Sequence, residues 1–375
     1  MTVLVLFCGG GGSSLGIHQA LPSVAVVGID SDADSCATHK AHGWQTIQAV
    51  VADLSPRNYG PASGLWASPP CTAWSSAGKR QAVGRTDEVL RYIADWRIGD
   101  GVKWRGDDPL VWLVTEPLRW ALTLMPKWVA CEQVPAVLPA WEATADRLRA
   151  VGYSTWTGVL NSADHGVPQT RERAILMASR VWTVHPPVRT HAEYPHPRLY
   201  GVDELPWVSM ADALGWKRTD VTHIRMDNRA NAAVRRVSEP SPPVLASHDN
   251  GNCVWVLDTH RGQDADGSTQ TRPLDRPAPS VTGKAASQWA FGRPATTVMG
   301  DGRVFPPDGH HPYQGRGSWS THAIKVTLEE LATLQGFPSG YQFAGNKRSR
   351  ARQIGNAVPP ALAEAVVRAL TEEET

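Results

Sequence analysis

The sequence predicts an α/β protein built on a largely parallel, doubly wound sheet. In the first 180 residues, short apolar runs rich in β-branched side chains alternate with segments of helical periodicity. Buried strands that alternate with helical crossovers are typical of parallel sheets covered by helices on both faces. The chain has 375 residues and is 42% hydrophobic, so one large domain or two ordinary ones can bury a core.

The expected elements follow one another in β–α order. Strands are expected at residues 3–7, 24–30, 47–54, 65–68, 128–134, 154–161 and 173–179. Helices are expected in or around residues 13–21, 32–42, 88–96 and 140–150, with a last helix at 361–370. Thr327 and Glu330 have the spacing of a capping box, which predicts a helix start there.

The composition changes in the middle of the chain. Residues 180–325 hold 15 of the 29 prolines and few helical patterns. Short strands that start at prolines, in a smaller β- and loop-rich domain, are the preferred interpretation of this stretch. Its repeated Pro-containing segments are irregularly spaced, so they do not indicate a solenoid.

Composition also excludes several classes of protein. No apolar run approaches the roughly 18 residues of a membrane span, and the first residues lack the basic region of a secretory signal. The five cysteines are scattered, with no Cys-x-x-Cys pair, which argues against a disulfide framework or a zinc site. We expect a cytoplasmic monomer without a metal. The net charge of +1 excludes a polybasic tail but is compatible with a local basic groove for nucleic acid.

A glycine-rich loop at residues 7–16 connects the first strand to the first helix. Glycines let the backbone turn tightly and approach a ligand, and the helix N-terminus offers free N–H groups. Such loops occur in dinucleotide sites, in adenosyl-cofactor sites and as simple tight turns. Asp30 and Asp53 are expected at the ends of the next two strands, where they would accept hydrogen bonds from ribose hydroxyls and an adenine amine. Together these features indicate a bound nucleoside.

Cys71 is the candidate nucleophile. A lone cysteine is more often a small buried hydrophobe, which is the preferred interpretation of Cys8 and Cys36. Cys71 differs because Pro69 and Pro70 fix the backbone just after the fourth strand, where open α/β sheets bind ligands. Only about 3% of an ordinary thiol is thiolate at pH 7, so neighbouring groups must assist it. A basic, glycine-bounded loop follows at residues 78–85 and is suited to closing over an anionic substrate.

At these residues the sequence resembles the cytosine-5 DNA methyltransferase family, of the bacterial or phage type. The matching motifs, in the family's order, are the Phe-x-Gly-x-Gly-Gly loop at 7–12, Pro69-Pro70-Cys71, Cys131-Glu-Gln-Val-Pro135, Gln169-Thr-Arg-Glu-Arg173, Leu331-Ala-Thr-Leu-Gln-Gly-Phe-Pro338 and Gln353-Ile-Gly-Asn-Ala-Val-Pro-Pro360. The resemblance covers residues 3–180 and 325–370, and only the Pro-rich middle is unmatched.

The resemblance implies a Rossmann-like doubly wound methyltransferase domain with a smaller β/loop-rich target-recognition domain. Residues 1–180 would form the catalytic and cofactor-binding domain, residues 181–325 the target-recognition domain, and residues 326–375 would return to the catalytic domain. The implied cofactor is S-adenosylmethionine and the implied partner is double-stranded DNA. The reaction would be methyl transfer to carbon 5 of a cytosine flipped out of the duplex.

The resemblance also implies roles for individual residues. Cys71 would add to carbon 6 of cytosine, and Glu132 would bind ring nitrogen 3 and the exocyclic amine. Arg171 and Arg173 would hold the cytosine carbonyl, the phosphate and the Glu132 carboxylate. Residues implied in cofactor binding are Phe7, Gly9, Gly11, Gly12, Asp30, Asp53, Leu113 and Asn356. Residues implied in substrate binding are Ser75, Lys79, Arg80 and Gln169.

Three positions depart from the family pattern. Val5 stands where Asp is frequent, Thr72 stands where Gln is common, and Gln133 replaces an Asn that helps to fix the Pro-Pro-Cys turn. None of the three removes a group that the chemistry requires.

Other functions fit the sequence less well. A catalytically silent DNA-binding homologue would normally have lost the nucleophile or the acid, yet Cys71 and Glu132 are present. An RNA cytosine-5 methyltransferase usually has a compact recognition region, whereas the 145 residues from 181 to 325 suit duplex DNA. A nicotinamide dehydrogenase would explain the glycine loop alone.

Overall fold

The computed structural model describes residues 1–74, 83–96, 108–195, 203–215, 223–225, 234–236, 238–241, 256–258, 324–325 and 327–371. Within these residues the main feature is a seven-stranded sheet with the order β3-β2-β1-β4-β5-β7-β6. Its strands are β1 (Thr2–Leu6), β2 (Ala25–Asp30), β3 (Gln45–Gln48), β4 (Gly64–Ala67), β5 (Trp128–Gln133), β6 (Ser154–Asn161) and β7 (Glu172–Ser179).

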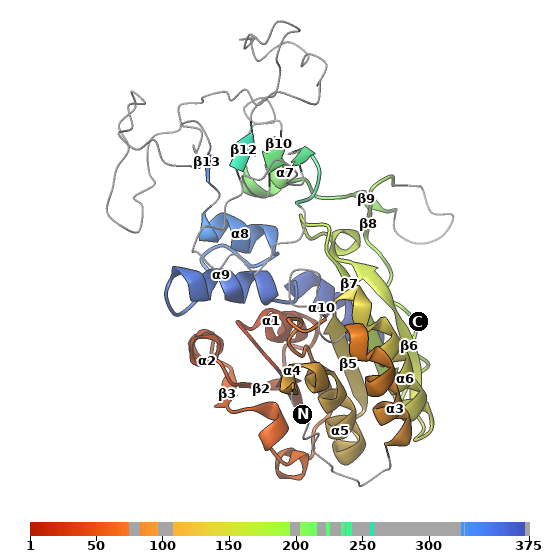
Figure 1. The fold of residues 1–375 in the computed structure, drawn as a ribbon. Helices are drawn as coiled ribbons and strands as arrows, with labels where there is room; N and C mark the ends of the chain where they lie inside the picture. The colour runs from red at the N-terminus through yellow and green to blue at the C-terminus, as the bar shows by residue number, and fades with distance from the viewer. Residues whose placement is uncertain are drawn as a thin grey trace, which may run out of the picture.

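Ten helices accompany the strands in the described part of the chain (Figure 1). They are α1 (Gly12–Ala20), α2 (Ala33–Ala41), α3 (Thr86–Asp95), α4 (Pro109–Trp112), α5 (Glu116–Leu124), α6 (Leu138–Arg149), α7 (Met210–Leu214), α8 (Leu328–Leu334), α9 (Lys347–Asn356) and α10 (Pro360–Thr371). In the described ranges, no helix is long and apolar enough to cross a membrane.

The sheet is parallel from β3 to β5 and antiparallel at β7 and β6. Strand order reverses at β1, which pairs with β2 on one side and with β4 on the other. A crevice at the carboxyl ends of the strands is expected at such a switch point, because the two following loops leave in opposite directions. The prediction of a largely parallel, doubly wound sheet is confirmed.

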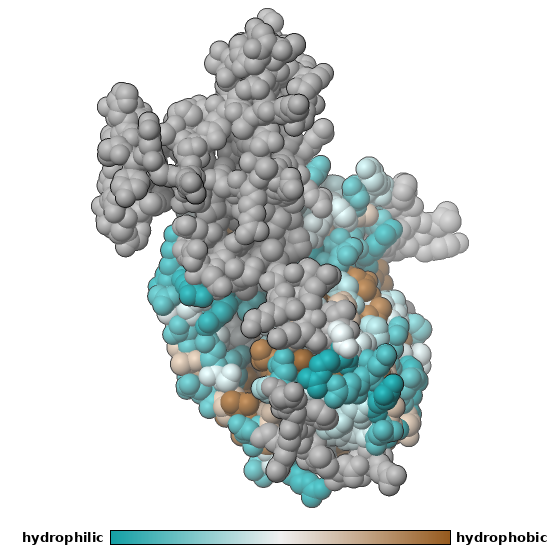
Figure 2. All heavy atoms as spheres, viewed as in Figure 1, coloured by the Kyte–Doolittle hydropathy of each residue, from teal (hydrophilic) through white to brown (hydrophobic). Residues whose placement is uncertain are grey.

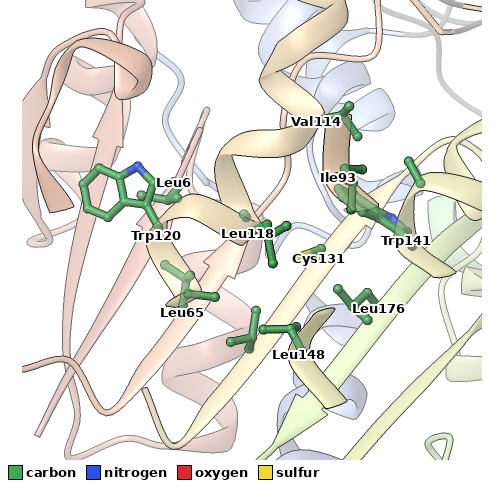
Figure 3. Packing of buried hydrophobic residues seen from close by; sticks show 14 of the residues in the cluster. Leu6, Leu65, Ile93, Val114, Leu118, Trp120, Cys131, Trp141, Leu148 and Leu176 are labelled. Atoms are coloured by element: carbon green, nitrogen blue, oxygen red, sulfur yellow. The ribbon is translucent and has the colours of Figure 1, made fainter. Parts of the chain in front are cut away.

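Alternation of apolar side chains along β1 fills the two layers that cover the sheet. Val3 and Val5 belong to the layer with α1 and α10, and Leu4 and Leu6 belong to the layer with α3, α5 and α6. Successive strand residues point to opposite faces, so a strand buried on both faces is apolar throughout. Members of the second layer are labelled in Figure 3, among them Leu118, Trp120, Trp141 and Leu148.

The end of the described chain returns to its beginning. In Figure 1 the blue helices α9 and α10 lie beside the red α1. The contact with α10 is so close that a Cβ atom on Gly12 would lie 2.2 Å from the Val358 carbonyl oxygen, and one on Gly16 would lie 2.3 Å from that of Pro360. Any larger side chain at either glycine would therefore force the two segments apart.

Local predictions met different outcomes. The capping box is confirmed, because the Thr327 hydroxyl accepts from the Glu330 N–H while the Glu330 carboxylate accepts from the Thr327 N–H. The strand expected at residues 47–54 is wrong beyond β3, because a 3-10 turn, η1 (Val51–Asp53), replaces its second half. Helix α5 was not predicted.

The middle of the chain contributes a second, four-stranded antiparallel sheet with the order β11-β10-β12-β13. Its strands are β10 (His223–Arg225), β11 (Val234–Arg236), β12 (Val256–Asp258) and β13 (Ile324–Lys325). Most of residues 181–325 lie outside the described residues, so the division into domains stays a prediction. On the face drawn in Figure 2, hydrophilic residues predominate over the described surface, and hydrophobic ones form small groups.

Candidate active site

The loops that carry the sequence motifs leave the same edge of the main sheet. The glycine loop follows β1, the Pro-Pro-Cys turn follows β4, and Glu132 and Gln133 end β5. Because β7 is antiparallel, its beginning lies at this edge too, and Ala174 pairs with Gln133. The topology therefore brings together motifs that are up to about 165 residues apart in sequence.

The glycine loop is held open by its backbone conformation. Phe7 and Gly9 both have positive φ angles, of 57° and 52°, which turn the chain sharply after β1. A Cβ atom on Gly9 would meet no atom within 4 Å, whereas one on Gly11 would collide with Trp44 and Tyr341. Gly9 therefore faces open space, as a ligand cradle requires, and Gly11 is needed for packing inside the protein. Phe7 is half-buried against the main core.

Asp30 fixes this loop to the end of β2. Its carboxylate accepts the N–H groups of Gly9 and Asp32, both at 2.9 Å. Burial raises the pKa of Asp30 above its ordinary value, although the two backbone hydrogen bonds act in the opposite direction. A carboxylate beside an open glycine cradle fits the ribose of a nucleoside, which offers two hydroxyl donors.

Four other residues expected at the cofactor lie on four separate segments. Asp53 ends η1 and is exposed; its place at the end of a strand was wrong. Leu113 is half-buried and begins η4 (Leu113–Thr115), directly before α5. Asn356 is the exposed last residue of α9. Gly12 is buried at the start of α1.

The Pro-Pro-Cys turn is anchored by Gln133. The Gln133 side chain is buried, and its Nε2 donates to the Pro69 carbonyl oxygen at 2.5 Å. A further turn bond runs from the Trp74 N–H to the Cys71 carbonyl at 2.9 Å. Cys71 itself is half-buried. Gln133 therefore makes the contact with the turn that the sequence analysis assigned to the family's Asn, despite its longer side chain.

Glu132 and Arg173 form an ion pair at the centre of the site. Arg173 Nε lies 2.9 Å from Glu132 Oε1, and the two side chains are 12% and 7% exposed. Arg171 is more deeply buried and donates from Nη1 to the Gly355 carbonyl oxygen at 3.1 Å. Burial lowers the pKa of Arg171 to about 9, with Arg173 acting in the same direction and Glu132 and Cys71 opposing it. Arg171 therefore stays protonated at neutral pH, within the electrostatic reach of both Cys71 and Glu132.

Gln169, expected at the substrate, lies in the interior. It is 0% exposed, and its Nε2 donates to Gln335 Oε1 at 2.7 Å and to the Leu334 carbonyl at 3.2 Å. Gln335 continues the chain of bonds by donating to the Ala357 carbonyl at 2.6 Å. These contacts join the Gln-x-Arg-x-Arg motif to the two late motifs.

Sequence analysis missed three supporting residues. Asn161 accepts the Arg171 N–H at 3.0 Å and so fixes the approach to β7. The Tyr341 hydroxyl donates to the Gly10 carbonyl at 2.7 Å, and Thr38 donates to Gln353 at 2.6 Å across 315 residues of sequence. None of the three belongs to a motif; only Gln353, the partner of Thr38, does, because it begins the last motif. Ser75, Lys79 and Arg80 lie outside the described residues.

Comparisons with known proteins agree with this arrangement. The chain is 25% identical over its whole length to a type II methyltransferase of Haemophilus parahaemolyticus, 88% of which is covered. It is 24% identical, again over its whole length, to a type II methyltransferase of Methanothermobacter thermautotrophicus, with 98% of that protein covered. The crystal structure of the S. pombe Dnmt2 methyltransferase matches 99% of the chain with a TM-score of 0.57 at 14% identity, with 98% of that structure covered, and so shares the fold.

The family described as C-5 cytosine-specific DNA methylase matches residues 1–95 and 101–372, nearly the whole chain. These residues include every motif quoted above, from the glycine loop to the last block. The chain therefore belongs to the C-5 cytosine-specific DNA methylase family.

Proposed function

We propose that this protein transfers a methyl group from S-adenosylmethionine to carbon 5 of cytosine in duplex DNA, at a specific short sequence. The observation that carries the proposal is the convergence of Cys71 with the Glu132–Arg173 pair at one edge of the sheet. A nucleophile, a carboxyl group and two guanidinium groups match what covalent activation of cytosine requires.

S-adenosylmethionine supplies an electrophilic methyl group when it is bound. The open cradle at Gly9 and the half-buried carboxylate of Asp30 fit its ribose. Asp53 would bind the adenine amine, Phe7 would pack on the adenine ring, and Leu113 and Asn356 would make further contacts with the cofactor. The cofactor set thus comes from the loops after β1 and β2, from η1, from η4 and from the end of α9.

The chemistry begins when the target cytosine leaves the base stack, since carbon 6 is out of reach inside a duplex. The Cys71 thiolate adds to carbon 6, and the electron pair of the 5,6 double bond makes carbon 5 a nucleophile towards the methyl group. A proton shared between the Glu132 carboxyl group and ring nitrogen 3 would hold the base in place and stabilise the charge that develops there. Once carbon 5 carries the methyl group, with S-adenosylhomocysteine as the leaving product, loss of the carbon 5 proton to solvent would expel the Cys71 thiolate and restore the double bond.

Arg173 has a positioning role in this scheme. Its 2.9 Å contact orients the Glu132 carboxylate from the neighbouring strand. Arg171, which is buried and donates to the Gly355 carbonyl, adds a positive charge within electrostatic reach of Cys71. Each of these residues therefore has one task that the other does not perform.

The test is transfer of labelled methyl groups from S-adenosylmethionine to mixed-sequence duplex DNA and, in parallel, to transfer RNA. Bisulfite sequencing then locates the methylated cytosines. We expect label in duplex DNA at one short sequence, none in Cys71→Ser, and full labelling in the control Cys36→Ser. Label on transfer RNA alone would establish the RNA activity instead, and no label on either would leave a silent homologue.

A further inference from the structure

A buried ion pair occupies the first turn of α5. Arg119 contacts the same Glu116 carboxylate oxygen twice, with its Nη2 at 2.6 Å and its Nε at 2.9 Å, and each residue is 5% exposed. The helix is otherwise embedded in the core, as Leu118 and Trp120 show in Figure 3. Burying two charges carries a large desolvation cost, and apolar side chains of similar volume often serve stability equally well. The further contacts of Arg119 indicate what the pair does.

Arg119 also holds the turn that contains Asp53. Its Nη1 donates to the Leu54 carbonyl at 3.0 Å, and its Nη2 donates to the Val51 carbonyl at 3.2 Å. These two carbonyls flank Asp53 in the chain. The planar fork of arginine is suited to this task, because it presents several donors in fixed directions.

The turn needs such a support because the sheet does not supply one. β3 ends at Gln48, three residues before η1 begins. The Leu54 N–H bonds back to the Val51 carbonyl at 3.3 Å, a long contact for a closing bond. Arg119 is therefore a tertiary anchor for this turn, provided from 65 residues further along the chain.

The same pair begins three residues after Leu113, another residue implied in cofactor binding. η4, which begins at Leu113, runs without a break into α5, and Glu116 is the first residue of that helix. The Thr115 hydroxyl donates to the Trp112 carbonyl at 2.8 Å and stiffens this junction. Whatever fixes α5 against η1 therefore fixes Leu113 relative to Asp53.

We propose that the Glu116–Arg119 pair is a positioning element for the adenine end of S-adenosylmethionine. Arg119 sets the place of Asp53 through the carbonyls of Val51 and Leu54, and Glu116 sets the orientation of Arg119. Neither residue touches the cofactor. The inference rests on the proposed function, because it assigns the cofactor to the site between η1 and η4.

The test removes both charges together, since removal of one would leave the other buried and uncompensated. The double variant Glu116→Gln/Arg119→Met is compared with Asp146→Asn/Arg149→Met, in which an exposed ion pair of the same spacing on α6 is removed. Calorimetric titration with S-adenosylmethionine should show about tenfold weaker binding for the first variant only, from the loss of two hydrogen bonds. The KM for the cofactor should rise in parallel, with kcat at saturation nearly unchanged.

A double-mutant cycle with Asp53→Ala separates positioning from general stability. If the pair acts through Asp53, adding Glu116→Gln/Arg119→Met to Asp53→Ala should weaken cofactor binding much less than it does in the wild-type background. If the pair variant raised the Kd for the cofactor by the same factor in both backgrounds, the proposal would be overturned. Unchanged cofactor affinity in the Glu116→Gln/Arg119→Met variant itself would also overturn it.

A second variant keeps the proposal testable if the first fails to fold. Arg119→Lys retains the charge beside Glu116, but one ammonium group cannot span two carbonyls and a carboxylate. It should weaken cofactor binding, and wild-type affinity in Arg119→Lys would overturn the proposal. Wild-type protein that fails to bind S-adenosylmethionine would overturn the proposed function as well, whereas a normal wild type with unaffected variants would overturn the positioning role alone.

Discussion

The side chain of Gln133 bridges the end of β5 and the turn before Cys71. Its amide nitrogen donates to the Pro69 carbonyl at 2.5 Å, and its amide oxygen accepts the Val134 N–H at 2.5 Å. Both hydrogen-bonding groups of the amide are used, and the side chain is 3% exposed. The nucleophile thus depends on a residue 62 positions later in sequence for the geometry of its turn.

Replacement of Gln133 by Leu should lower kcat by roughly tenfold or more. The change keeps the volume but leaves the buried Pro69 carbonyl without its donor, which costs about 1–3 kcal/mol. Single-turnover methyl transfer measures the effect, with cofactor affinity as the internal control. Wild-type rates in Gln133→Leu would show that the turn holds its shape without the amide.

Cys71→Ser should abolish methyl transfer. A hydroxyl has too high a pKa to form the attacking anion near neutral pH. Binding of S-adenosylmethionine and of duplex DNA should stay at wild-type strength, because neither requires the thiolate. The check combines a transfer assay with two binding titrations, and measurable turnover would remove Cys71 from the mechanism.

Glu132→Gln should slow the reaction by at least about a hundredfold, the usual scale for loss of a general acid–base group. Gln keeps the shape of the side chain and an acceptor for Arg173, so the fold should tolerate the change. A thermal unfolding temperature close to that of the wild type checks the fold, and single-turnover kinetics measure the rate of methyl transfer. A loss below threefold would assign Glu132 to the support of Arg173 only.

Asp30→Asn should weaken cofactor binding about tenfold or more. One carboxylate oxygen becomes an amide nitrogen, so either the Gly9 N–H or the Asp32 N–H loses its acceptor, and bonds to charged groups are worth about 1.5–3 kcal/mol. Calorimetric titration with S-adenosylmethionine measures the loss. Unchanged affinity would refute the ribose assignment.

Stability should fall as the pH decreases below about 6.5 because of His39. The ring is fully buried between the hydroxyls of Ser14 and Thr46, each at 2.7 Å, and burial lowers its pKa to about 4. In the unfolded chain His39 has the ordinary pKa of about 6.5. Between pH 6.5 and 4 it is therefore protonated in the unfolded chain and neutral in the folded protein. The contribution of His39 is complete above pH 6.5 and is lost as the pH falls towards 4.

Between pH 7.5 and pH 5.5 this loss should amount to about 1.4 kcal/mol. Urea unfolding of the wild type and of His39→Gln at both pH values measures it. Gln retains an amide for the two hydroxyls and does not take up a proton. From pH 7.5 to pH 5.5 the free energy of unfolding of His39→Gln should therefore fall by about 1.4 kcal/mol less than that of the wild type. Equal slopes in the two proteins would contradict the assignment.

Short motifs with local backbone requirements were predictable from the sequence, and long-range supports were not. The glycine loop and the turn at Cys71 follow from residue types that allow few conformations. Asp53 was misplaced because the apolar run at residues 49–52 suits a continuing strand as well as a 3-10 turn after a short strand. The tertiary anchor that decides between the two, Arg119, lies far along the chain.

Gln169 illustrates the same limit within the site. It belongs to a motif that the resemblance places at the substrate, yet its partner Gln335 is 166 residues away and makes it part of the interior. No local sequence pattern predicts a contact over such a separation. The closeness of Glu132 and Arg173 was anticipated only through the resemblance, and in the structure the neighbouring strands β5 and β7 bring the two side chains together.

The contact of Gly12 and Gly16 with the carbonyls of Val358 and Pro360 has a consequence for biosynthesis. The glycine loop after β1 is synthesised more than 300 residues before the segment that packs against it. Contacts of this sequence separation form late in folding. The start of α1 therefore lacks this packing until the residues around 358–360 have been made, and on the proposed function cofactor binding should depend on their arrival.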